Sequence, residues 1–173
     1  GVEYLVNALP EILKKFENAQ VIFVGNYQNV IGEQAYKAKI LQMIEGLGEH
    51  WKFLGIISET EKAAFFHLCD VLVLPSINST ESFGMVQVEA MTCGTPVVAT
   101  DLPGVRQPVR STGMGKIVPI KNSAALATAI KEVLNGADWL DSHGERALQH
   151  FYSPETVAEA YEILYQDLIA NDG

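Results

Sequence analysis

The sequence has little cysteine, few basic residues and no long apolar run, and each shortage excludes a class of protein. Its 173 residues include only two cysteines, Cys69 and Cys93, which show neither CxxC nor histidine-rich spacing. A disulfide framework or a metal-binding module is therefore not indicated, and two reduced thiols favour a cytoplasmic protein. Twelve lysines and arginines against 21 aspartates and glutamates give a net charge of −9, which argues against a nucleic-acid partner.

The sequence also lacks the features of membrane insertion. No apolar run approaches the ~20 residues that span a bilayer, and no signal peptide opens the chain. With 48% hydrophobic and 19% charged residues, the composition is that of a globular protein. The length suits one domain with a proper core.

Strands and helices are expected to alternate along the chain. Short apolar runs predict strands, and amphipathic stretches predict helices. Ser58 and Glu61 form a capping box, and Ser153 caps the last helix, which has Pro154 at its first position. The expected strands are Gln20–Gly25, Trp51–Gly55, Asp70–Leu74, Pro96–Thr100 and Lys116–Ile120, with a loop over Asp101–Gly115. The expected helices are Gly1–Asn18, Glu33–Leu47, one beginning after Ser58, one opening at Gly84, Ala124–Leu134, Asp138–His150 and Pro154–Ala170.

This alternation predicts an α/β fold, a Rossmann-like parallel sheet with helices on both faces. Ligands of such sheets bind beyond the carboxyl ends of the strands. The expected strands end at Gly25, Gly55, Pro75–Ser76 and Thr100–Asp101. These ends should therefore cluster around the helix that opens at Gly84.

The stretch from Glu81 to Met91, ESFGMVQVEAM, contains the strongest candidate site. A glycine at a helix start lets the backbone approach a ligand, and the unpaired N–H groups of the first turn form an anion site. Glu89 lies one turn further along the same helix face, and Glu81 lies in the loop before it. A glutamate in an exposed helix is usually only solvated, but this combination suits a phosphorylated sugar.

Several motifs together resemble one enzyme family. They are Pro75-Ser76, Glu81-Ser82-Phe83-Gly84, Glu89-Ala90-Met91 and the segment Gly94–Thr100, GTPVVAT. With these motifs the chain resembles the retaining nucleotide-sugar glycosyltransferases of the two-Rossmann-domain (GT-B) type, in the large family 4, also called glycosyl transferases group 1. The resemblance extends more loosely over nearly the whole chain and implies the C-terminal, donor-binding half of such an enzyme.

The resemblance implies a role for each part of the motif. The backbone N–H groups of Gly84, Met85 and Val86 would hold the donor diphosphate. Glu89 would accept hydrogen bonds from the two ribose hydroxyls, for which a carboxylate is suited because it accepts two bonds at once. The implied reaction transfers a hexose from a nucleoside diphosphate sugar to an acceptor, with retention of anomeric configuration and with no metal or other cofactor.

Further residues are assigned to the donor by the same resemblance. Glu81 is the implied catalytic residue; it either stabilises the oxocarbenium-like sugar or only orients it. The backbone of Phe83 and Gly84, together with Glu81, would hold the hexose. Ile56 and Ile57 would border the base, and Ser76 belongs to the donor site.

The resemblance also implies parts that residues 1–173 do not contain. Family members usually have a strand, an arginine and a Lys–Gly pair before a segment like Gly1–Leu5, so the first strand of the sheet and both cations are expected to be missing. The sheet should then be gapped or rearranged. An N-terminal Rossmann domain would supply the acceptor site and any peripheral membrane contact, and the last helix would pack against it. We expect residues 1–173 alone to be inactive.

Some polar residues keep two interpretations. Asp101 either touches the donor sugar or caps Gly104, and Arg106 and Arg110 either help to neutralise phosphate or are solvated. His67 lies on an apolar helix face and is expected to be a packed core residue and not a catalyst.

Two other functions compete with glycosyl transfer. One is another reaction of the same scaffold, by an epimerase or a phosphorylase, which the Glu-x7-Glu pair with Phe-Gly disfavours. The other is a nucleotide-binding module with no activity of its own. Intact Glu81 and Glu89 argue against degeneracy of the motif, although an incomplete enzyme would behave in this way.

Overall fold

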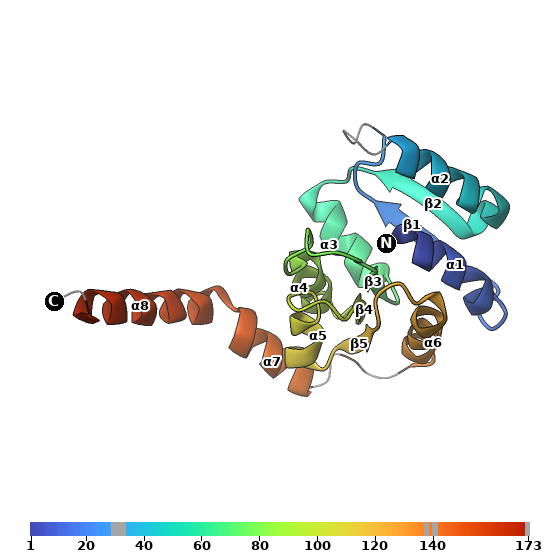
Figure 1. Cartoon of the computed structure of the whole chain (residues 1–173). Coiled ribbons are helices and arrows are strands. Elements are labelled where there is room, and N and C mark those ends of the chain that lie inside the picture. The colour runs from blue at the N-terminus through green and yellow to red at the C-terminus, as the bar shows by residue number, and fades with distance from the viewer. Residues whose placement is uncertain (29–33, 137–138, 140–141, 172–173) are drawn as a thin grey trace.

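The computed structural model of the chain describes residues 1–28, 34–136, 139 and 142–171, and its strands form two parallel sheets (Figure 1). The first sheet pairs β1 with β2, with Val21 opposite Trp51. The second has the order β3-β4-β5, with Leu72 opposite Val97 and Val97 opposite Gly115. The strands are β1 (Val21–Val24), β2 (Trp51–Gly55), β3 (Leu72–Leu74), β4 (Val97–Thr100) and β5 (Gly115–Val118).

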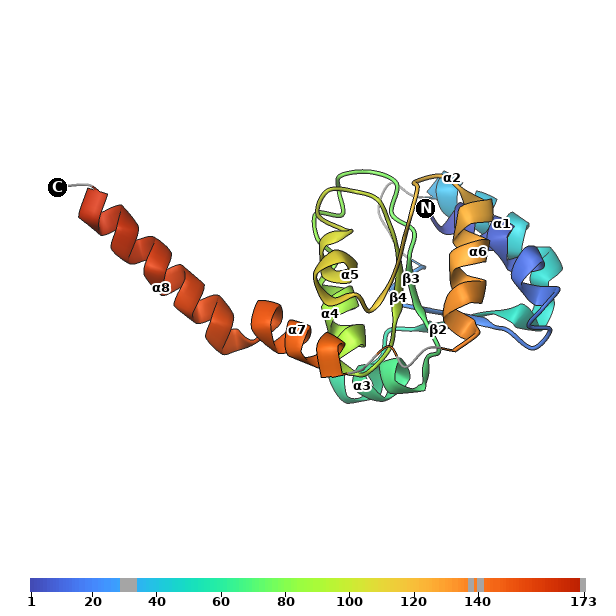
Figure 2. The same cartoon turned by 90° about the horizontal axis from the view of Figure 1, so that it is seen from below.

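Helices cover both faces of these sheets (Figures 1 and 2). They are α1 (Val2–Leu13), α2 (Gln34–Ile44), the 3₁₀ helix η1 (Glu45–His50), α3 (Glu59–Leu68), α4 (Met85–Thr92), α5 (Gln107–Thr112), α6 (Ser123–Leu134), α7 (Ser142–Tyr152) and α8 (Pro154–Asn171). Parallel strands with helices on both faces confirm the predicted fold class.

The central strand β4 divides the hydrophobic core in two. Successive side chains of a strand point to opposite faces, so Val98 packs with α1 and α6, whereas Val97 and Ala99 pack with α3, α4 and α5. All three side chains are fully buried. Burial on both faces explains why this strand is a continuous apolar run and not an alternating one.

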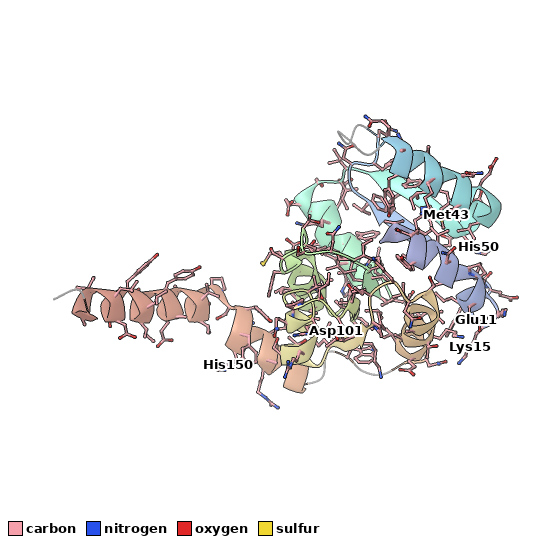
Figure 3. All side chains as sticks on the ribbon, in the orientation of Figure 1. Glu11, Lys15, Met43, His50, Asp101 and His150 are labelled. Atoms are coloured by element: carbon pink, nitrogen blue, oxygen red, sulfur yellow. The ribbon has the colours of Figure 1, made fainter. Side chains whose placement is uncertain are left out.

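Polar contacts also join α1 to α6. Lys131 Nζ lies 3.0 Å from Glu11 Oε1, and Lys15 Nζ donates to Asn135 Oδ1 at 2.5 Å. Figure 3 labels Glu11 and Lys15 at the end of α1 that lies beside α6. Helices α1 and α6 therefore form one layer over the sheets.

Two predicted helix starts are confirmed by their caps. Ser58 accepts from the amide of Glu61, whose carboxylate accepts in return from the amide of Ser58, which is the reciprocal pattern of a capping box. Ser153 Oγ accepts from the amide of Thr156 at 3.1 Å, and α8 begins at Pro154. These contacts are local, so the residue types alone specify them.

The predicted loop over Asp101–Gly115 was wrong, because it contains α5. Pro108 stands in the first turn of α5, where the missing N–H of proline has no cost. Gly113 ends the helix in the left-handed conformation. The residues that indicated a loop are therefore the start and stop signals of a short helix.

Other boundaries differ by a few residues. The first helix ends at Leu13, and the helix expected to reach Leu47 continues after Ile44 as η1. The last strand is Gly115–Val118, earlier than expected. Glu33 and Asp138, predicted to begin helices, lie outside the described residues.

The last helix, α8, projects away from the sheets and their covering helices in both views (Figures 1 and 2). Its apolar side chains are exposed, including Tyr161, Leu164 and Leu168, which are between 49% and 55% accessible. Within the described residues, no helix combines the length and the apolar character that crossing a membrane requires.

The stability of the fold should depend on the layer formed by α1. Leu9 is 1% exposed in the core between α1 and α6, whereas Leu68, at the end of α3, is 81% exposed. Leu9→Ala should lower the free energy of unfolding by about 2–5 kcal/mol, and Leu68→Ala should change it by less than about 0.5 kcal/mol. Urea denaturation followed by circular dichroism measures both, and equal effects would contradict this assignment of the core.

Candidate functional site

A cavity of about 900 Å³ lies between the two sheets and is lined by β1 on one side and β3 on the other. Its deep part is apolar and includes Leu5, Leu9 and Ile12 of α1. Within the described residues β1 and β3 do not pair, which corresponds to the gapped sheet, one of the two arrangements that the family resemblance implies.

The cavity reaches the carboxyl ends of the strands. Its wall there contains Gly25 after β1, Ile56 and Ile57 after β2, Ser76 after β3, and Val86 of α4. The structure thus brings four of the predicted donor-binding residues to the lining of one cavity. Ile56 is 79% exposed, so an apolar side chain is presented to any ligand at this edge.

The first turn of α4 has free backbone donors. Gly84 precedes the helix with φ 79° and ψ 65°, and no side chain caps this end. Among the described residues, the amides of Gly84, Met85 and Val86 have no hydrogen-bond acceptor. Unpaired N–H groups and the positive end of the helix dipole favour an anion at this position.

Glycine is required at position 84 by both conformation and space. The left-handed φ disfavours other residues, and a Cβ would lie 2.6 Å from Leu74 Cδ2 and 2.9 Å from Gln87 Nε2. Gly104, in the loop before α5, is equally restricted, because a Cβ there would lie 1.6 Å from the backbone oxygen of Ser82. The loop before α4 is therefore packed against the loop before α5.

Glu89 does not line the cavity, but it is joined to a residue that does. Lys62 of α3 is in the cavity wall, and its Nζ lies 3.2 Å from Glu89 Oε2 and 2.8 Å from Glu59 Oε2. Hydrogen bonds to Glu59 and Glu89 raise the pKa of Lys62. Sequence reasoning missed Lys62, because a contact between α3 and α4 leaves no local signal.

Glu81 and Phe83 lie in the loop before α4 and also stay outside the cavity wall. Glu81 is half-buried and has no hydrogen bond or ion pair within the described part of the chain. The Phe83 ring packs against Tyr152, with 6.0 Å between ring centroids, and joins the core beside α4 and α5. The ring of Phe83 is therefore used in packing, whereas the side chain of Met85 is 61% exposed.

Asp101 and Arg106 pair with each other, at 2.8 Å between Asp101 Oδ1 and Arg106 Nη1. Figure 3 labels Asp101 in the region of α5. Asp101 was expected to touch the donor sugar or to cap Gly104, and neither interpretation predicted a pair with Arg106. His67 is exposed and not packed in the core as expected; its Nδ1 lies 3.4 Å from the carbonyl oxygen of Cys93.

No arrangement suited to metal binding was found in the described residues, where no three His, Cys, Asp or Glu side chains gather around one point. Cys69 and Cys93 are free thiols. Burial, with a smaller effect of Asp70, raises the pKa of Cys69 to about 11. Cys69 is therefore a thiol and not a reactive thiolate near neutral pH.

A second residue that sequence reasoning missed is Gln87, a fully buried polar side chain of α4. Its Nε2 donates to the backbone oxygens of Phe83 and Val105, each at 2.9 Å. The signal that could have found it is a single amide among apolar residues in the segment Met85–Met91, because a polar side chain on a buried helix needs a specific partner.

Comparisons with known proteins agree with the motif. Residues 1–150 match the family described as glycosyl transferases group 1. A phosphatidyl-myo-inositol mannosyltransferase of Mycobacterium leprae is 40% identical over 134 residues, which are 78% of this chain and 33% of that protein. The chain thus spans about a third of the length of this curated relative.

Two solved structures are similar over nearly the whole chain. Sucrose-phosphate synthase from Thermosynechococcus elongatus has a TM-score of 0.81 and 31% identity, covering 99% of this chain and 43% of that one. Anabaena Alr3699/HepE in complex with UDP and glucose has a TM-score of 0.79 and 27% identity, covering 96% of this chain and 45% of that one. With the family match over residues 1–150, these likenesses show that the chain belongs to the glycosyl transferases group 1 family.

Proposed function

We propose that this chain is the donor-binding domain of a retaining glycosyltransferase, which transfers a hexose from a nucleoside diphosphate sugar to an acceptor. The observation that carries the proposal is the uncapped first turn of α4, with Gly84 left-handed before it and the amides of Met85 and Val86 free of acceptors among the described residues. Family membership supports glycosyl transfer. The UDP and glucose bound to Anabaena HepE, a structural neighbour, support a donor of this kind.

The diphosphate of the donor is assigned to the first turn of α4. Negative charge develops on the leaving diphosphate as the sugar acquires oxocarbenium character. Donors that already point at this charge stabilise the transition state more than the ground state. The residues of this chain therefore contribute positioned backbone N–H groups to catalysis.

The nucleoside is assigned to the side of the site that faces α3 and β2. Glu89 accepts hydrogen bonds from the ribose hydroxyls while Lys62 holds its Oε2 atom. Within the described residues Glu89 Oε1 has no partner, so it is available to a ligand. Ile56 and Ile57 are assigned to the base, and Ser76, which lines the same cavity, is assigned to the donor.

Glu81 is the proposed catalytic residue. Its half-buried carboxylate stands in the loop that leads into α4, beside the proposed diphosphate site, and no ion pair with a described residue neutralises it. A negative charge at this position suits an oxocarbenium-like sugar, whether the charge stabilises the cation directly or orients the hexose hydroxyls.

We propose that a second Rossmann domain completes the enzyme and binds the acceptor. Two features suit further polypeptide beyond residues 1–173. The cavity between β1 and β3, with a parallel strand edge on each side and apolar residues of α1 in its lining, suits one more parallel strand of this same sheet. The exposed apolar side chains of α8 suit a contact with another domain.

Nucleotide binding should depend on Glu89. In the full-length polypeptide that contains this domain, Glu89→Gln should weaken binding of the preferred nucleotide among UDP, GDP and ADP by about tenfold or more. The reason is that charge-assisted hydrogen bonds contribute about 1.5–3 kcal/mol and 1.4 kcal/mol corresponds to tenfold. Calorimetric titration measures the affinity. Glu159→Gln, on α8, is the matched control, and equal affinities of the two variants would contradict the assignment.

Transfer activity should depend on Glu81 more than binding does. Glu81→Gln should lower kcat by about 100-fold or more, because the charge that faces the sugar is lost, while the affinity for the nucleoside diphosphate stays within about twofold because that ligand lacks the sugar. Sugar transfer or donor hydrolysis measures kcat, and NMR of the product gives its anomeric configuration. An unchanged kcat would remove Glu81 from the mechanism, and an inverted product would exclude a retaining enzyme.

A further inference from the structure

The side chain of Gln87 is completely buried at the start of α4, and its hydrogen bonds join two loops. Nε2 donates to the oxygen of Phe83, in the loop before α4, and to the oxygen of Val105, in the loop before α5. Both acceptors are backbone carbonyls. Only the NH₂ group of an amide can serve both, so the orientation of this side chain is determined by its partners.

The same orientation leaves Gln87 Oε1 buried without a partner among the described residues. An unsatisfied buried acceptor has a cost, which the two hydrogen bonds donated by Nε2 offset. Packing alone would be met by an apolar side chain of similar volume such as methionine, so the partners of Nε2 indicate what this amide does.

The hydrogen bond from Gln87 to the Phe83 oxygen acts on the peptide between Phe83 and Gly84. This peptide is trans, so the C=O of Phe83 and the N–H of Gly84 point in opposite directions. When Gln87 holds the carbonyl oxygen on the core side, the amide of Gly84 faces away from the core. Glycine permits rotation of this peptide at little steric cost, and the hydrogen bond from Gln87 opposes that rotation.

We propose that Gln87 is a positioning residue, which fixes the Phe83–Gly84 peptide so that the Gly84 N–H points at the donor phosphates. This inference rests on the proposed function, because it assigns the anion at the start of α4 to a nucleoside diphosphate. The hydrogen bond from Gln87 to the Val105 oxygen also joins the loop before α5 to α4, near the point where Gly104 closely approaches Ser82. Gln87 itself touches no ligand in this arrangement.

The test compares two nucleotides that differ by one phosphate. In the full-length polypeptide, the affinity for the preferred nucleoside diphosphate among UDP, GDP and ADP is divided by the affinity for its monophosphate. Gln87→Met should lower this ratio about tenfold, the loss expected when one charge-assisted hydrogen bond of the Gly84 N–H is no longer held in place. The melting temperature should fall, because the backbone oxygens of Phe83 and Val105 lose their partner. Gln87→Glu should lower the ratio as well, because a carboxylate cannot donate to the two carbonyls.

Thr92→Val is the matched control, since Thr92 also donates from its side chain to a backbone oxygen of α4, at the opposite end of the helix. For this variant, the ratio of diphosphate affinity to monophosphate affinity should equal that of the unmodified protein. Equal loss of both nucleotides, an unchanged ratio, or failure of both Gln87 variants to fold would assign Gln87 a structural role and overturn the proposal. If the unmodified protein binds none of the three diphosphates, the proposed function itself is wrong.

Discussion

The candidate site depends on how closely two loops approach each other. Gly104, before α5, lies so near Ser82, before α4, that any Cβ at position 104 would overlap the Ser82 oxygen. Gln87 spans the same two loops with hydrogen bonds to Phe83 and Val105. Together these contacts hold the entry to α4 in one conformation. A helix start can bind an anion only when its amides are held in place and free, so this loop pair is the basis of the site.

The sheets position these loops but do not form the site themselves. β3 and β4 deliver the two loops to the same edge, because parallel strands have their carboxyl ends together. Because β4 is buried on both faces, its position is fixed relative to α4 on one side of the sheet and α6 on the other. The cavity between β1 and β3 is lined by Ile56, Ile57 and Val86.

Local sequence signals predicted the parts of the structure that depend on neighbouring residues. The capping box at Ser58, the start of α8 at Pro154 and the helix after Gly84 could all be predicted because residues a few positions apart determine them. The helix α5 was missed, since Pro108 and Gly113 indicate a loop and a short helix equally well.

Contacts between distant segments explain the rest of what sequence reasoning missed. Lys62 meets Glu89 across 27 positions, and Gln87 meets Val105 across 18. No periodicity or cap encodes such pairs, because they follow from how α3, α4 and α5 pack. The predicted site residues Ile56, Ile57, Ser76 and Val86 line the same cavity, but the family motif and not the pattern of apolar residues selected them.

The most direct test of the proposed donor site is a crystal structure of the full-length protein with the nucleoside diphosphate that it binds. A phosphate oxygen is expected within about 3.2 Å of the amide nitrogen of Gly84 or Met85, with the ribose hydroxyls at Glu89. A nucleotide bound elsewhere, with no anion at the start of α4, would contradict this assignment.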